Sequence, residues 1–305
     1  MPLYYPSFFR TVLGTCGFAV QIDGRRKELL LDVCDRLFNE RVGVGEAFIR
    51  VGKSKLQLDL ANRSERLLYY AAHNLLRSYR KSPLYSIIAR LALPSSLFID
   101  IGANLGLYSF LARSLGYETL LFEPEPTLWA FLSRNREVIG TPVACALSDQ
   151  CGTSEFFVSG PTNPGSSSLV IPKDGRRSEY ERTVPVRLCT FDSSLSELGI
   201  LTSSIRFIKI DVEGNEEHTL LGMRDYLAEP SSAPIWCEVR GPSSGRNGNS
   251  VNAATEILGG FGYVAFSFNG RHFTPYRLGY DPAPQVFDLL YAVPARHGEI
   301  LNLPA

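Results

Sequence analysis

The sequence contains little histidine. Among its 305 residues there are only four, at His73, His218, His272 and His297, and they are scattered along the chain. A catalytic or structural zinc site of the common kind draws several histidine or cysteine ligands together. The scatter therefore argues against a histidine-based metal site.

The sequence also lacks a Cys-x-x-Cys pair. Three of its six cysteines lie in apolar, strand-like runs, where cysteine behaves as a small hydrophobic residue. Without paired spacing there is no sign of a disulfide framework, so we expect reduced thiols and a cytoplasmic protein. The six are Cys16, Cys34, Cys145, Cys151, Cys189 and Cys237.

Excess charge and long apolar runs are missing as well. Lysine plus arginine number 31, as do aspartate plus glutamate, so the formal net charge is zero. A nucleic-acid partner would call for clustered basic charge, which argues against one here. No stretch approaches the ~20 apolar residues of a membrane span, so we expect no integral membrane segment. Nothing in these features sets an oligomeric state.

What the sequence does have is a strand, a glycine turn and a helix start at Leu97–Ser109. An apolar run ends in Asp100, and a turn from Gly102 to Gly106 follows. Such a turn presents backbone N–H groups and a helix N-terminus to a ligand. The spacing is not the G-x-G-x-x-G of dinucleotide folds, and Asp100 would repel a pyrophosphate but suit a cationic ligand. The alternative is an ordinary strand-to-helix connection.

Strands and helices alternate from this point onward, which predicts an α/β fold with a mostly parallel sheet and helices on both faces. Residues 1–55 show no clear secondary-structure pattern, and we expect them to form an accessory region. The expected strands are Leu97–Ile101, Thr119–Phe122, Pro142–Ala146, Ile205–Ile210, Pro234–Val239, Tyr263–Phe266 and Phe287–Val293, with Gly152–Val158 and Val184–Leu188 as an antiparallel pair.

Acidic residues gather where these strands end. In an open α/β sheet, ligands bind beyond the carboxyl ends of the strands. Burying unpaired acids is costly, so such a set implies a solvated cleft, a cationic ligand or a metal. After the second strand, Glu123 is placed to accept both hydroxyl hydrogens of a ribose. The acids are Asp100, Glu123, Asp149, Asp211, Glu213 and Glu238.

Four segments occur in an order that resembles the FkbM family of S-adenosylmethionine-dependent methyltransferases. They are DIGANLG (Asp100–Gly106), FEPEP (Phe122–Pro126), ALSD (Ala146–Asp149) and IKIDVEGNE (Ile208–Glu216). The resemblance implies a class I, Rossmann-like methyltransferase sheet of seven strands with the last strand antiparallel. It places the methyltransferase domain at 56–295, after the 1–55 accessory region and before a 296–305 tail.

The resemblance also implies S-adenosylmethionine as the methyl donor and distributes its contacts over three turns. A donor that carries a sulfonium and an ammonium agrees with an acidic first turn. The implied contacts are Asp100, Gly102, Asn104 and Gly106 for the methionine side, Glu123 for the ribose hydroxyls, and Ser148 and Asp149 for the adenine.

Asp211 is the first candidate for a general base or substrate-orienting group, because it ends a central strand beside the turn from Gly102 to Gly106, here called the donor turn. Glu213 and Glu238 are second candidates, and Lys209 is placed to pair with one of the acids. The alternative is a helix N-terminus decorated with acids, which is common. The three acids would suit magnesium, but the sequence does not require a metal and we predict none.

The resemblance implies a hydroxyl acceptor on a sugar, glycan or secondary metabolite. Two loops, Ser159–Thr183 and Arg240–Ser250, are expected on the acceptor side. Their basic residues would suit an anionic acceptor, or would be solvated loop charges; they are Lys173, Arg176, Arg177, Arg182, Arg240 and Arg246. Two other functions stay open at this point, a nucleotide-dependent oxidoreductase and a non-catalytic cofactor-binding module.

Overall fold

The computed structural model describes most of the chain from residue 45 onward. The described residues up to 82 form one compact unit, and those from 83 form a second, larger one. Most of the expected accessory region and most of the two acceptor loops lie outside the described residues, and the domain boundaries stay a prediction. The described residues are 45–51, 53–62, 65–66, 68–69, 79–159, 166–170, 180–241, 250–279, 281 and 286–301.

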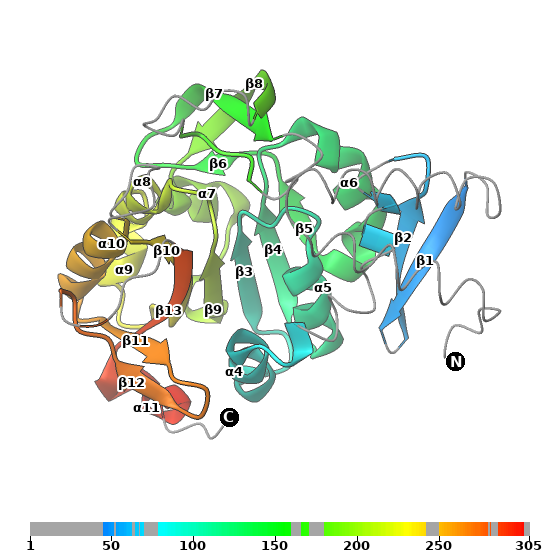
Figure 1. Ribbon diagram of the computed structural model, residues 1–305. Coiled ribbons are helices and arrows are strands. Elements are labelled where there is room, and N and C mark those ends of the chain that lie inside the picture. Colours follow the sequence, from blue (N-terminus) through cyan, green and yellow to red (C-terminus); the bar gives the residue numbers. More distant parts are fainter. Residues whose placement is uncertain are drawn as a thin grey trace. The chain divides into compact units, whose positions relative to one another are not determined.

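The smaller unit contains a β-hairpin. Strand β1 (Glu46–Val51) pairs antiparallel with β2 (Ser54–Asp59), and both are drawn in blue in Figure 1. In β2 the apolar residues Leu56 and Leu58 are buried, while Lys55 and Asp59 are exposed. This alternation is the signature of a strand with one buried face.

The larger unit is built on an eight-stranded sheet (Figure 1). Neighbouring strands β10, β9, β3, β4 and β5 are parallel, whereas β13 runs antiparallel to β10 and β11. The prediction of a mostly parallel sheet with its last strand antiparallel is confirmed. In spatial order the strands are β12 (Phe273–Pro275), β11 (Val264–Phe268), β13 (Val286–Ala292), β10 (Ile235–Arg240), β9 (Ile205–Ile210), β3 (Leu97–Ile101), β4 (Glu118–Phe122) and β5 (Thr141–Val143).

The expected count of seven strands is wrong by one. The additional strand is β12, a three-residue edge strand that pairs antiparallel with Phe266–Phe268 of β11. A segment of three residues ending in Pro275 is too short to show a periodicity, and only its pairing with β11 makes it a strand.

Helices cover both faces of this sheet. On one face, α4 (Pro83–Leu91), α5 (Leu107–Ser114) and α11 (Pro294–Leu301) pack on a core that includes Phe98 and Phe207. On the other face, the core holds side chains of α7 (Phe191–Leu198), α8 (Glu216–Leu221), α9 (Arg224–Ala228) and α10 (Ser250–Gly259). Within the described residues, no helix combines the length and the hydropathy needed to cross a bilayer.

A second, three-stranded sheet has the order β6-β8-β7, with β7 (Gly152–Ser159) antiparallel to β8 (Tyr180–Cys189). This pair confirms the antiparallel strands expected from the sequence. The single strand expected at Pro142–Ala146 is instead divided, because β5 joins the main sheet and β6 (Ala146–Leu147) pairs with β8. The turn between them brings the N–H of Cys145 within 3.0 Å of the carbonyl oxygen of Val143.

The helices on the rest of the chain follow local signals. Thr190 caps α7 by accepting a hydrogen bond from the N–H of Ser193, and Gly199 ends it with φ near 65°. Both are the expected end residues of a helix. After β4, the 3₁₀ turn η1 (Pro126–Leu128) leads into α6 (Trp129–Ile139), and η3 (Thr202–Ser204) precedes β9. The described cysteines, Cys145, Cys151, Cys189 and Cys237, are free thiols.

Phe207→Ala should destabilise the larger unit by about 3–5 kcal/mol, because it removes a fully buried ring and leaves a cavity. Phe207 stacks on Phe98 with ring centroids 6.2 Å apart. The free energy of unfolding in urea measures the loss. Leu201→Ala is the control, since Leu201 is 73% exposed, and it should change stability by less than about 0.5 kcal/mol. Equal losses in both variants would contradict this packing.

Candidate active site

The turn after β3 packs directly against the end of β9. Gly102 has φ near 72°, and a Cβ there would lie 1.8 Å from the carbonyl oxygen of Asp211. Only glycine fits at such a close approach with a positive φ. The N–H of Asp211 donates to the carbonyl oxygen of Ile101 at 3.0 Å, so the two strand ends are held together. Asn104 in the same turn also has a positive φ, near 52°.

A cavity lies beside this turn and is bordered by the ends of β3, β4 and β9. The volume of this cavity is about 50 Å³. That is smaller than the pockets of about 300–1,000 Å³ that hold drug-sized ligands, so a nucleoside enters only if side chains of the wall move. The polar lining residues include Asn104, Glu123, Glu125, Asp211, Glu213 and Asn215.

Glu123 contributes a buried carboxylate to the wall of this cavity. Its Oε2 accepts a hydrogen bond from the N–H of Asn104 at 2.7 Å, and its Oε1 accepts one from the N–H of Glu125 at 2.9 Å. Burial raises the pKa of Glu123 to about 7. The hydrogen bonds from the two N–H groups lower this pKa, and repulsion from Glu125 and Asp100 raises it further. Near neutral pH, Glu123 is therefore present in both its protonated and its ionised form, and the ionised form can accept hydrogen bonds from both hydroxyls of a diol.

Asp100 does not line this cavity but faces the opposite side of β3, towards α5. Its Oδ2 accepts a hydrogen bond from the hydroxyl of Ser109 at 2.8 Å, and its Oδ1 lies 3.4 Å from Nζ of Lys209. Lys209 also lies 3.3 Å from Oδ2 of Asp211, which confirms that it pairs with the acids. Burial opposes the charge of Lys209, but Asp211 and Asp100 outweigh it and raise the pKa of the ammonium above its usual value.

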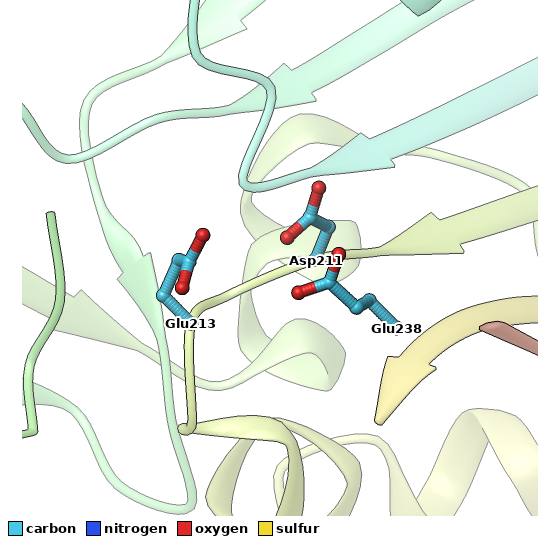
Figure 2. Close-up of side chains that lie close together, drawn as sticks. All are labelled: Asp211, Glu213 and Glu238. Atoms are coloured by element: carbon cyan, nitrogen blue, oxygen red, sulfur yellow. The ribbon is translucent and has the colours of Figure 1, made fainter. Parts of the chain in front are cut away.

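The three catalytic candidates converge. Carboxylate oxygens of Asp211, Glu213 and Glu238 all lie within 4.8 Å of one another. Figure 2 shows Asp211 and Glu213 on the segment that follows β9, and Glu238 reaching towards Asp211. The guanidinium of Arg240 pairs closely with Glu213 and lies 3.8 Å from Oε1 of Glu238. Three such oxygens can hold a divalent cation. Lys209 and Arg240 already compensate the negative charges of these acids. The absence of a metal stays a prediction.

The proton of Glu238 is held tightly. Burial raises its pKa to about 9, with repulsion from Asp211, Glu213 and Asp288 acting in the same direction and Arg240 opposing it. Glu238 is therefore mostly protonated at neutral pH. A carboxyl group that burial and like charges keep neutral can donate a hydrogen bond at neutral pH.

Four of the cofactor contacts expected from the sequence are not in the wall of the cavity. Besides Asp100 they are Gly106, whose φ near 65° lets α5 begin, and the pair Ser148 and Asp149. The N–H of Ser148 donates to the carbonyl oxygen of Cys189, and Asp149 lies 3.4 Å from Nδ1 of His218. Their assignment to the cofactor stays a prediction.

Sequence reasoning also missed residues. Glu125 lines the cavity and was present in the FEPEP segment, whereas Arg240 was assigned to a loop. Arg240 in fact ends β10 and is buried. The alternation of Trp236, Glu238 and Arg240 indicates that Arg240 shares a strand face with Glu238, whereas its contact with Glu213 depends on how the strands pair.

The comparison with protein families now bears on this geometry. A model described as the methyltransferase FkbM domain matches residues 100–265. The chain belongs to the FkbM methyltransferase family. It is accordingly an S-adenosylmethionine-dependent methyltransferase, and the match runs from the end of β3 into β11, across every strand end that borders the cavity. No curated protein matches the chain.

Several solved structures are similar to this FkbM-family chain at low identity. A precorrin-6Y C5,15-methyltransferase from Geobacter metallireducens is 13% identical, with 68% of this chain and 85% of that one covered and a TM-score of 0.37. TYW2 from M. jannaschii, solved with AdoMet, is 12% identical, with coverages of 81% and 84% and a TM-score of 0.38. The magnesium protoporphyrin IX methyltransferase of Synechocystis, solved with SAH, is 12% identical, with coverages of 93% and 97% and a TM-score of 0.38.

Cofactor affinity should rise with pH around neutrality. The ionised form of Glu123 is the one that accepts both ribose hydrogens, so binding strengthens as pH rises through the free-protein pKa of about 7 and levels off above it. Calorimetric titration with S-adenosylhomocysteine from pH 6 to 8 measures this. In Glu123→Gln the affinity should be lower and the slope lost, while Glu217→Gln, at an exposed position of α8, should keep both. A slope that persists in Glu123→Gln, or binding of NAD in place of this ligand, would contradict the assignment.

Proposed function

We propose that this methyltransferase transfers its methyl group to a hydroxyl oxygen of a small-molecule acceptor, such as a sugar, glycan or secondary metabolite. The observation that carries the proposal is the position of Asp211. It lines the cofactor cavity, pairs with Lys209 and lies within 4.8 Å of two further acids. A hydroxyl nucleophile must lose a proton, and a carboxylate at this point is placed to take it.

The cavity residues fit the cofactor. Glu123 is a buried carboxylate with free acceptor capacity on both oxygens, as a ribose diol requires. Gly102 keeps the turn close to β9, where any side chain would collide with backbone. Bound S-adenosylmethionine supplies an electrophilic methyl group. The protein's part is to hold the acceptor oxygen in line with that group and to receive its proton.

The three acids are suited to different tasks. Asp211 faces the cavity with a cation on one side, so it is the proton acceptor. Glu213 is engaged by Arg240 and holds that guanidinium at the end of β10. Glu238 carries a proton at neutral pH, since burial and its neighbouring acids raise its pKa to about 9. It therefore acts as a hydrogen-bond donor that orients the acceptor or Asp211.

Asp211→Asn should lower turnover by about 10²–10⁴-fold, the usual contribution of a general base, while cofactor affinity stays within about threefold of the natural protein. Asparagine keeps the shape of the side chain but cannot accept a proton. Methyl transfer is followed by release of S-adenosylhomocysteine, and affinity is measured by calorimetry. Unchanged turnover would remove Asp211 from the chemistry. A natural protein that binds the cofactor but methylates no hydroxyl compound would favour a non-catalytic binding module.

Glu238→Gln should keep turnover at pH 7 within about threefold of the natural protein, because glutamine resembles the protonated carboxyl group. In the natural protein, turnover should fall above pH 9 as Glu238 ionises beside Asp211. The variant should lack this fall. A pH–rate profile of both proteins measures the difference. Loss of activity at pH 7 in the variant would show that Glu238 works in its ionised form and is the base.

The family match favours methyl transfer over hydride transfer, the other reaction considered for a chain with an acid after its second strand. The missing G-x-G-x-x-G spacing points in the same direction. A hydroxyl acceptor also agrees with the site's own chemistry, since an oxygen nucleophile needs the proton acceptor that Asp211 provides.

A further inference from the structure

A second hollow lies in the larger unit, away from the cofactor cavity. It is a groove of about 660 Å³ beside strands β11, β12 and β13. Its volume falls within the range of about 300–1,000 Å³ that holds small organic ligands. Aromatic and acidic side chains dominate its wall, among them Trp236, Phe268, Tyr276, Phe287, Asp281 and Asp288.

The aromatic walls are held in place by ring contacts. The rings of Trp236 and Phe268 both pack on Phe273, with centroid distances of 6.3 and 5.2 Å. Tyr276 packs on Phe287, with ring centroids 5.7 Å apart. Fixed aromatic walls favour flat or ring-shaped ligands, and the negative faces of the rings attract cations.

Carboxylates give the groove a negative character. Among its described lining residues are Asp281, Asp288 and one cation, Arg277. Asp281 accepts a hydrogen bond from the backbone N–H of Arg277, and the indole of Trp236 donates one to Asp288. Although Asp288 is exposed at the surface of the groove, the protein around it and the charge of Asp211 raise its pKa above the usual value, with the hydrogen bond from Trp236 and the charge of Lys209 opposing them. A cation brought beside Asp288 would relieve this repulsion.

A row of acids joins the groove to the reaction centre. Asp288 on β13 lies directly opposite Glu238 on β10 in the strand register. A carboxylate oxygen of Glu238 is in turn within 4.8 Å of one of Asp211, and Asp211 lines the cofactor cavity. The strands concerned, β9, β10 and β13, are neighbours in one sheet (Figure 1). Asp288, in the wall of the groove, is therefore separated from the proposed base by Glu238 alone in this row of acids.

We propose that this groove binds the methyl acceptor through a protonated amino group held by Asp288 between the aromatic walls. The acceptor is then a ring compound that carries both a hydroxyl and an amine, such as an amino sugar. An anionic acceptor would meet the carboxylates of Asp281 and Asp288 and is disfavoured by their charges. The inference rests on the proposed function for the identity of the bound molecule as acceptor.

Glucosamine and glucose are matched probes, because they differ in one amino group. At about pH 6, where an amine of this kind is mostly protonated, saturation-transfer NMR titrations give their affinities. Glucosamine should bind about tenfold more tightly than glucose. In Asp288→Asn most of this preference should vanish, and in Glu155→Gln, an exposed acid on β7, it should persist. Equal binding of the two sugars, no binding of either, or a preference that survives Asp288→Asn would overturn the inference.

Titration with S-adenosylhomocysteine separates this result from the proposed function. Asp288 does not line the cofactor cavity, so Asp288→Asn should bind this ligand as the natural protein does. If the amine preference holds while glucosamine and other hydroxyl compounds are not methylated, the groove is supported and the proposed reaction fails. If a hydroxyl compound without an amine is methylated and no amine preference exists, the reaction stands and the groove's selectivity is overturned.

Discussion

The ammonium of Lys209 holds the centre of this molecule together. It lies within 3.4 Å of Asp100 on β3 and 3.3 Å of Asp211 after β9, and both Lys209 and Asp100 are buried. An isolated charge at that depth would be very costly, so each of the three groups depends on the others. The pairing ties the carboxyl ends of the two central strands together. The donor turn and the proposed base are therefore parts of one packed unit.

This constraint explains how so many acids coexist at one edge of the sheet. Lys209 compensates Asp100 and Asp211, and Arg240 compensates Glu213. Glu238 lies 3.8 Å from Arg240, but burial and its three acidic neighbours outweigh this cation and raise its pKa to about 9. Protonation is the usual response of a carboxyl group buried among like charges. The site thus brings acids that are paired with cations beside one whose pKa is raised.

The same edge of the sheet continues beyond the cavity at the ends of β3, β4 and β9. Because β13 returns antiparallel to β10, the start of β13 meets the end of β10, and Asp288 comes to lie beside Glu238. The edge strands β11 and β12 then supply aromatic walls. One face of the sheet thereby carries a polar row from β3 to β13 above a core that includes Phe98, Phe207 and Trp236. Residues two apart share a strand face, so the core and the polar row lie on the same face, with the polar residues nearer the carboxyl ends of β3, β9 and β10.

The sequence by itself determined the β–turn–α unit at Leu97–Ser109, the alternation of the parallel strands and the position of the acids at strand ends. These depend on local periodicity, glycine turns and caps, which act over a few residues. Only the tertiary structure decided that Asp100 faces Lys209 rather than the cavity, that Arg240 belongs to the acids, and that β12 and the groove exist. Those features depend on pairing between segments far apart in the chain, and no local pattern encodes which strand lies beside which.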